Sequence, residues 1–363
     1  MQIAITKKLS DKLKIGKLQP VDPPDSFYTW RANITQSGHC RLLVFMHEAS
    51  RYMLVVQRPL AKDFKHIQEL FLKTLRGALL LEQINPAVVE RYIAEAGEIT
   101  FTANSGKKET TCLNKACRYA WYGFDENYNN DYLSVFPSHI RLGDLDKEPF
   151  APSQIFIEML SRYDLPVKSS VAYDLTIRLE LGGTEAVRHI RVPANITFTL
   201  LHKIIQNAYC WQNYHLFRFC FYEDAFNYYS KPDLELISIE KQFIDDESEA
   251  DAILTHDVCL SDYLPKWKIC MYNYDYGDNW YHFIELTKVH TYHEGDMPLM
   301  LFGSGDAPPE DVGGISGFKE FRRIITSPND DEYEEMISWA NMQHWEPFNF
   351  DKTAKKVQSA LWR

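Results

Sequence analysis

The stretch Lys266 to Val289, KWKICMYNYDYGDNWYHFIELTKV, contains two strand-like runs on either side of one short turn. Aromatic and β-branched residues are frequent in both runs, which is typical of β-strands. Gly277 lies in the turn segment Asp275 to Asp278, and glycine permits the positive φ that a tight hairpin requires. The stretch therefore predicts an antiparallel hairpin at the centre of the C-terminal fold.

Strands and helices alternate around this hairpin in the second half of the chain. The runs VAYDLTIRLEL (171–181) and AVRHIRVP (186–193) are separated by a Gly-Gly turn and predict another hairpin. Apolar residues recur at helical spacing over 199–209, and HLFRFCFY (215–222) predicts a further strand. Three more helices are expected, beginning near Gly317, Asp330 and Asp351.

The first half of the chain shows the same mixture. The runs CRLLVFMHE (40–48) and RYMLVVQR (51–58) predict a hairpin, and a long helix is expected from Ala61 to Gln83. Further elements are expected in the order strand 1–6, strand 29–35, helix after Asn85, strand 97–104, helix 109–122 and helix 154–160. The predicted fold is α+β with two domains, each a mostly antiparallel sheet packed with helices.

Length and composition agree with this organisation. A chain of 363 residues exceeds one typical domain, and we place the boundary near Asp164, giving domains 1–164 and 165–363. No run approaches the roughly 18 apolar residues of a membrane span, and no signal peptide is expected. The seven cysteines form no CxxC pattern, so we expect free thiols and a cytoplasmic location.

Charge is divided unevenly between the two halves. Residues 1–165 carry 21 Lys+Arg and 19 Asp+Glu, whereas the remainder carries 18 and 31, within a formal net charge of -11. An acidic surface repels phosphate backbones, so nucleic acid is expected to bind only through the N-terminal half, and a protein partner through the acidic half. The acidic run 245–251 is expected to be solvated. The N-terminal half also contains a basic run, Lys7, Lys8, Lys12, Lys14 and Lys17. This run would either contact nucleic acid or form an ordinary solvated edge.

Seven short segments occur in a fixed order in the second half: YDLTIRLEL, VRHIRVP, TLLHKIIQNAYCW, YHLFRF, YDYGDNWYH, PPEDVGG and NFD. In this order and spacing they resemble the plasmid pRiA ORF-three-like family over about residues 168–351. Seven ordered segments are far more specific than one short pattern. The resemblance implies an α+β fold and an association with mobile elements, and it implies no particular reaction.

Two positions depart from that family pattern. Val187-Arg188-His189 stands where the family often has Trp-Arg-Arg, and Val312 stands where it often has Cys. Any metal or thiol role of that cysteine is therefore absent. The first half resembles a bacterial domain of unknown function through ITKKLSDKL, WRANI and SRYMLVV, and this resemblance implies no activity.

The candidate chemistry lies in YDYGDNWYH (274–282) and PPEDVGG (308–314). Side chains alternate along a strand, so Asp278 and His282 share one face and become candidates for an acid/base or metal site. Glu310 and Asp311 would add carboxylates from a loop stiffened by prolines and glycines.

Asp275 and His215 complete the set of candidate metal ligands. His215 is preferred over His202, which is expected on the polar side of its helix. Carboxylates with one or two histidines suit Mg²⁺ or Mn²⁺, and no structural zinc pattern is present.

Each candidate also has a structural explanation. A histidine on the same face as Trp280 fits a core histidine whose ring nitrogens are hydrogen-bonded. Glu310 and Asp311 would complement the dipole of the following helix. Asp275 and Asp278 fit a turn, where Asp commonly accepts hydrogen bonds from its own backbone. The sequence leaves both explanations open.

Two functions follow from these observations. The first is a non-catalytic interaction or accessory protein, and the second is a metal-dependent hydrolase or nuclease-like enzyme that uses the Asp, His and Glu candidates. The first is preferred because the chain contains no GxGxxG, GxxxxGK[ST], GxSxG or HExxH motif.

Overall fold

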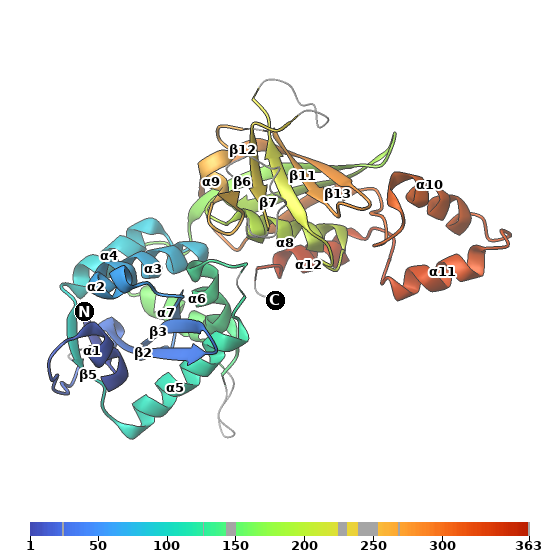
Figure 1. Ribbon diagram of the computed structural model, residues 1–363. Helices are drawn as coiled ribbons and strands as arrows, with labels where there is room; N and C mark the ends of the chain where they lie inside the picture. Colours follow the sequence, from blue (N-terminus) through green and yellow to red (C-terminus); the bar gives the residue numbers. More distant parts are fainter. Residues whose placement is uncertain are drawn as a thin grey trace. The chain divides into compact units, whose positions relative to one another are not determined.

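Two β-sheets organise the structure, a computed structural model that describes residues 1–23, 25–125, 127–142, 150–223, 231–238, 253–267 and 269–361. Each sheet belongs to one of two units, the N-terminal unit Met1–Ser170 and the C-terminal unit Val171–Leu361. The domain boundary predicted from the sequence lies near Asp164. The α+β fold is confirmed (Figure 1). The acidic run 245–251 lies outside the described residues.

The sheet of the N-terminal unit has five strands in the order β4-β3-β2-β1-β5. Its predicted hairpin is formed by β3 and β4, which pair antiparallel with Met46 opposite Met53. Strand β1 runs parallel to both of its neighbours, so this sheet is mixed. Parallel neighbours need long crossover connections, and helices supply them here. The strands are β1 (Gln2–Ile5), β2 (Thr29–Ser37), β3 (Cys40–His47), β4 (Met53–Gln57) and β5 (Thr100–Ala103).

Helices connect and cover these strands. The helix predicted over 61–83 forms as two helices that meet at His66, and Asn85 caps the next helix, which has Pro86 in its first turn. The apolar face of α5 packs on β3 and β4, with Leu113 and Ala116 in the same core cluster as the two strands. The helices are α1 (Lys7–Leu13), α2 (Ala61–Lys65), α3 (Ile67–Leu81), α4 (Pro86–Ala96), α5 (Lys107–Tyr122), α6 (Asn130–His139) and α7 (Pro152–Leu160).

Helix α6 completes the hydrogen bonding of the edge strand β4. The hydroxyls of Ser134 and Ser138 are buried and accept hydrogen bonds from the backbone N–H groups of Val55 at 2.8 Å and Met53 at 2.9 Å. An edge strand otherwise presents unpaired N–H groups. These two serines therefore hold the edge of the sheet against α6.

Replacing Ser138 by Ala is expected to destabilise the N-terminal unit by about 1–3 kcal/mol, because the N–H of Met53 is left buried without an acceptor. Hydrogen exchange of the β4 amides should accelerate, while Ser161→Ala on the exposed end of α7 should change nothing measurable. Unchanged protection of the Met53 amide in Ser138→Ala would contradict the assigned role.

The sheet of the C-terminal unit has eight strands in the order β10-β9-β8-β11-β12-β6-β7-β13. The predicted hairpins are β6 with β7 and β11 with β12, both antiparallel. Strand β13 forms one edge and has a bulge between Met300 and Phe302. The strands are β6 (Ser170–Glu180), β7 (Glu185–Pro193), β8 (Phe217–Phe221), β9 (Leu234–Ile237), β10 (Ile253–Leu254), β11 (Ile269–Tyr274), β12 (Trp280–His293) and β13 (Leu299–Ser304).

Helix α8 (Phe198–Tyr209) covers one face of this sheet, and α12 (Phe350–Gln358) packs on α8. Because α8 has packing partners on two sides, His202 is buried and not on a polar surface as the sequence suggests. Its Nδ1 accepts from the hydroxyl of Tyr272, and its Nε2 donates to Oδ1 of Asn213, both at 2.7 Å. The other helices are α9 (Leu260–Tyr263), α10 (Gly314–Ile325) and α11 (Tyr333–Met342).

Two expectations from composition can be compared with the structure. The seven cysteines are all free thiols. Among the described helices, none is both long and apolar enough to cross a membrane.

Candidate functional site

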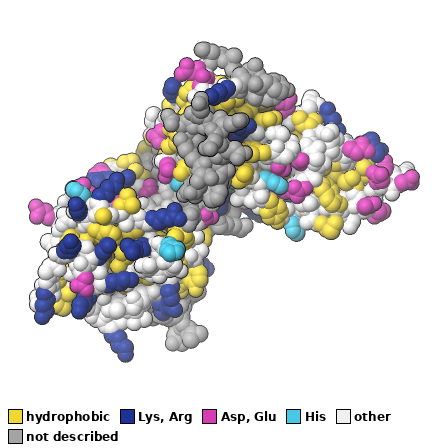
Figure 2. Space-filling view, in the orientation of Figure 1, with side chains coloured by type: hydrophobic (Ala, Val, Ile, Leu, Met, Phe, Trp, Pro, Cys, Tyr) yellow, Lys and Arg dark blue, Asp and Glu magenta, His cyan; other side chains and the backbone are white. Residues whose placement is uncertain are grey.

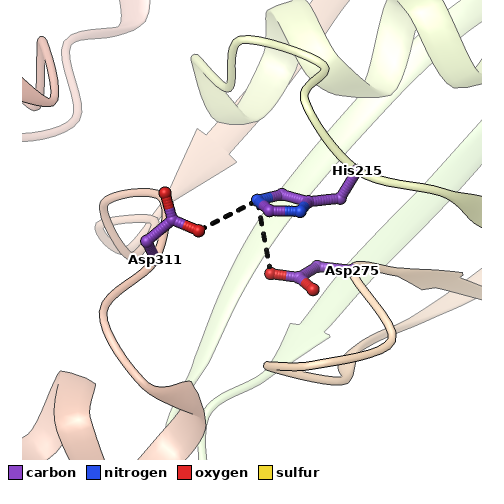
Figure 3. Close-up of side chains that lie close together, drawn as sticks. All are labelled: His215, Asp275 and Asp311. Atoms are coloured by element: carbon purple, nitrogen blue, oxygen red, sulfur yellow. Dashed lines mark ion pairs between the residues drawn. The ribbon is translucent and has the colours of Figure 1, made fainter.

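Three side chains from separate loops of the C-terminal unit point toward one another (Figure 3). His215 precedes β8, Asp275 begins the turn between β11 and β12, and Asp311 lies between β13 and α10. Nε2 of His215 lies 3.1 Å from Oδ1 of Asp311 and 3.6 Å from Oδ2 of Asp275. The three potential ligand atoms all lie within 4.8 Å of one another. We call these three residues the His215 cluster.

The turn that follows β11 holds Asp275 in place. Oδ1 of Asp275 accepts a hydrogen bond of 2.9 Å from the backbone N–H of Gly277, which is the turn chemistry expected from the sequence. Its backbone N–H donates to the carbonyl of Leu216 at 3.0 Å and so ties the turn to the loop of His215. The turn uses Oδ1, and Oδ2 remains directed at His215.

The PPEDVGG loop that carries Asp311 is fixed at both ends. The indole of Trp211 donates to the carbonyl of Pro308 at 2.9 Å. The N–H of Gly313 donates to Oδ2 of Asp278 at 3.1 Å. Asp278 therefore anchors this loop, at the start of α10, and its carboxylate is not one of the three clustered groups.

Glu310 lies behind the cluster and is almost completely buried. Its Oε1 accepts from the backbone N–H of Gln212 at 2.8 Å and from the hydroxyl of Tyr274 at 3.0 Å, and its Oε2 is 3.8 Å from Nε2 of His215. Burial raises the pKa of Glu310, while the two donors and His215 work in the opposite direction. This carboxyl is placed to orient the imidazole of His215.

His282 lies in the core. It is fully buried, with its ring against Tyr209, Trp211 and Tyr272. Nδ1 of His282 donates to the carbonyl of Trp280 at 3.1 Å, and burial lowers the pKa of the imidazole to about 3. Its face of β12 is the one covered by α8, which strand alternation alone does not reveal. Of the six predicted metal candidates, the structure brings together His215, Asp275 and Asp311, places Glu310 beside them, and leaves Asp278 and His282 outside the cluster.

The His215 cluster is open to solvent on one side. The side chain of Asp311 is 55% exposed, against 28% for His215 and 9% for Asp275. Nε2 of His215 is itself buried and makes no hydrogen bond with any described residue, because the 3.1 Å approach to Asp311 lacks hydrogen-bond geometry. An imidazole nitrogen that faces two carboxylate oxygens without a hydrogen bond is suited to share a cation with them.

Both carboxylates of the cluster stand on left-handed backbone. The φ angles are 58° for Asp275 and 57° for Asp311. Asp tolerates this region better than most residues, yet it remains uncommon and is concentrated at turns and functional sites. The turn hydrogen bond from Gly277 orients the side chain of Asp275, and the fixed loop backbone places that of Asp311.

Several supporting residues are not apparent from the sequence. Tyr274 and the backbone of Gln212 hold Glu310, and Trp211 holds the loop. Buried Arg188 binds the end of α8. Tyr274, Trp211 and Arg188 lie in the segments YDYGD, NAYCW and VRHIRVP, respectively. In the sequence, the feature that could have indicated these supporting roles is the high frequency of Tyr and Trp next to the acidic loop residues.

Both halves of the chain are similar to known protein families. Residues 171–354 match the family described as plasmid pRiA4b ORF-3-like protein, and residues 2–154 match a domain of unknown function, DUF6933. The chain is 27% identical over 198 residues to the uncharacterized protein y4hQ of Sinorhizobium fredii (strain NBRC 101917 / NGR234), covering 53% of this chain and 95% of that protein.

A solved structure is also similar, the protein of unknown function MM3350 from Methanosarcina mazei Go1. It has 27% identity, a TM-score of 0.42, and coverage of 50% of this chain and 96% of that chain. The relatives are described as uncharacterised or of unknown function, so they assign no reaction. The family match spans the whole region that contains the His215 cluster, and the chain belongs to the plasmid pRiA4b ORF-3-like family.

Proposed function

We propose that the protein binds a divalent cation of the Mn²⁺ or Mg²⁺ class through the His215 cluster and uses it for metal-dependent hydrolysis of a phosphoester in the cytoplasm. The observation that carries this proposal is the buried Nε2 of His215, which faces two carboxylates without a hydrogen bond. Imidazole with carboxylates suits Mn²⁺, and a purely oxygen-preferring Mg²⁺ would retain more water.

Two of the three spacings in the cluster support this assignment. Ligands held about 2.1 Å from a hard cation in octahedral geometry lie roughly 3 to 4.2 Å apart. The distances of 3.1 Å and 3.6 Å from His215 to the two carboxylates fall in this interval. Three protein ligands would leave coordination positions for water and substrate, as in catalytic metal sites.

Exposed apolar side chains beside the cluster favour a second candidate function, a cation-bridged contact with a protein partner. Tyr214 is 66% exposed, Tyr276 45% and Leu216 44%, and these residues flank His215 and Asp275 in the chain. Tyrosines that combine a large apolar area with a polar tip are frequent in interfaces. The same side chains would contact the substrate of a hydrolase.

Isothermal titration calorimetry with Mn²⁺, Mg²⁺ and Zn²⁺ tests the metal site. Wild type is expected to bind one Mn²⁺, and Asp275→Asn or Asp311→Asn to weaken binding by at least roughly 10- to 100-fold. Asp331→Asn, a change at an exposed carboxylate outside the cluster, is the matched control and should bind as wild type does. If wild type binds none of the three cations, the proposal is overturned.

A hydrolysis assay separates the two candidate functions. Turnover of bis-p-nitrophenyl phosphate that requires Mn²⁺ and disappears in Asp275→Asn supports the hydrolase. Tight Mn²⁺ binding without turnover of this or other phosphodiesters supports the cation-bridged contact.

A further inference from the structure

A cavity of about 590 Å³ lies in the N-terminal unit, far in the chain from the His215 cluster. One wall is a single face of α5, where lining residues follow at helical spacing from Lys107 to Tyr119. The other walls come from the β3–β4 hairpin and from the bridged pair Leu142 and Phe150. Its volume is that of a site for a small organic molecule.

The floor of this cavity is apolar. Its accessible apolar surface comes from the half-buried side chains of Tyr119, Leu142 and Phe150. Met46 and Met53 lie behind this surface, are 2% and 0% exposed, and belong to the core cluster that packs β3 and β4 against α5. Ala116 belongs to the same cluster and also lines the cavity.

The rim of the same cavity is cationic. It carries Arg51, Lys107, Lys108 and Lys115, and none of the lining residues that the structure describes is a carboxylate. Arg51, Lys107 and Lys108 make no ion pair with any residue that the structure describes. Figure 2 shows Lys and Arg side chains gathered around hydrophobic surface on the N-terminal unit, at the lower left.

The two lysines at the start of α5 do not stabilise their own helix. They occupy its first turn, where cations oppose the helix dipole. An anion bound between them would remove this repulsion. The arrangement therefore complements a ligand that has both negative charge and apolar surface.

We propose that this cavity binds an amphipathic organic anion, with its apolar chain or ring against Tyr119, Leu142 and Phe150 and its carboxylate, sulfonate or phosphate group among Arg51, Lys107 and Lys108. Apolar burial supplies the affinity, and the cations select the charge of the head group. A neutral molecule of the same shape gains affinity from apolar burial but none from the cationic rim.

Two fluorescent probes of nearly the same shape test this assignment on the full chain. Anilinonaphthalene sulfonate carries a negative charge, and N-phenyl-1-naphthylamine has the same ring system without it. Wild type is expected to bind the sulfonate at one site, about 10-fold more tightly than the neutral probe, and decanoate should displace it.

Three variants locate the binding site. Arg51→Gln/Lys107→Gln/Lys108→Gln should weaken sulfonate binding about 10-fold and leave binding of the neutral probe unchanged. Thr111→Trp, at an exposed position of α5 that lines the cavity, should abolish binding of both probes. Lys7→Gln/Lys14→Gln/Lys17→Gln removes the same charge from exposed positions elsewhere in the unit and should bind both probes as wild type does.

Circular dichroism and thermal unfolding establish that each variant is folded before binding is measured. Sulfonate binding that survives Thr111→Trp would overturn the proposal, and so would equal weakening of both probes in the cationic triple variant. The metal titration of the C-terminal unit does not bear on this outcome, because none of its residues lines the cavity.

Discussion

Lowering the pH from 7.0 to 5.5 is expected to reduce the free energy of unfolding of the C-terminal unit by about 2.5 kcal/mol. The cause is the pair of buried histidines His202 and His282. Burial lowers the pKa of each imidazole to about 3, from an ordinary value near 6.5. Both remain neutral in the folded state over this pH range.

The direction of the effect follows from where the protons bind. Below pH 6.5 the unfolded chain takes up a proton at each histidine and the folded chain does not, so the unfolded state is stabilised. Stability is therefore complete above pH 6.5 and falls progressively as the pH decreases toward 3. Each histidine contributes about 1.2 kcal/mol between pH 7.0 and 5.5.

The two histidines differ in how replaceable they are. Both nitrogens of His202 are hydrogen-bonded, whereas Nε2 of His282 has no hydrogen-bond partner among the described residues. His282→Phe keeps a ring against Tyr209 and Trp211 and removes the titrating group. This variant should lose about 1.2 kcal/mol of the wild-type pH dependence.

Urea titration with pulsed hydrogen exchange and mass spectrometry measures each unit separately in the full chain. His344→Asn, at an exposed position with positive φ, is the matched control and should keep the wild-type pH dependence. The N-terminal unit should change by less than about 1 kcal/mol. There, burial lowers the pKa of His47 to about 4 and raises the pKa of Asp131 to about 6, and the two effects oppose each other. An undiminished pH dependence in His282→Phe would contradict the assignment.

One buried carboxyl group of the C-terminal unit acts in the opposite direction to the two histidines. Burial raises the pKa of Glu310, so the folded state binds this proton first and gains stability as the pH falls.

Strong periodicity made most of the fold predictable. The hairpins β3–β4, β6–β7 and β11–β12 and the helices α3 and α8 follow directly from alternation or from apolar residues three and four apart. Helix α6 was not predicted, because Pro137 lies inside it and interrupts the expected pattern. Strand β13 was not predicted because its bulge shifts the alternation between Met300 and Phe302.

The sequence predicts which residues are candidates for the site, but it does not predict which of them lie close together. His215, Asp275 and Asp311 are all among the sequence candidates, together with His282 and Asp278, which have other roles. The selection depends on two left-handed aspartates and on a loop fixed by Trp211, and neither leaves a periodic signal in the sequence. Long-range hydrogen bonds decide which carboxylates meet.

Replacing Arg188 by Met is expected to destabilise the C-terminal unit by roughly 3–5 kcal/mol, the largest effect of a single substitution predicted for this chain. Arg188 is 1% exposed and has no ion-pair partner among the described residues. Burial lowers the pKa of its guanidinium, yet arginine stays protonated in proteins. The fold therefore contains a buried cation whose direct contacts, among the described residues, are backbone carbonyls and aromatic rings.

The contacts of Arg188 join three elements. Nε donates to the carbonyl of Ala208 in the last turn of α8 at 2.8 Å, where the helix dipole favours a cation. Two further bonds reach the carbonyl of Ser304 at 2.8 Å and that of Gly305 at 3.2 Å, at the end of β13. The guanidinium also lies 4.0 Å from the ring centroid of Phe348, just before α12.

Loss of the guanidinium leaves these carbonyls buried without a donor, and each such group costs about 1–3 kcal/mol. Arg188→Lys keeps the charge but not the planar set of donors, so it should recover only part of the stability. Arg178→Met removes a half-exposed partner of Glu285 and should cost less than about 1 kcal/mol. The free energy of unfolding of the C-terminal unit is measured for all three variants by the same urea titration with pulsed hydrogen exchange. If Arg188→Met were as mild as Arg178→Met, the packing of α8, β13 and α12 would not depend on this cation.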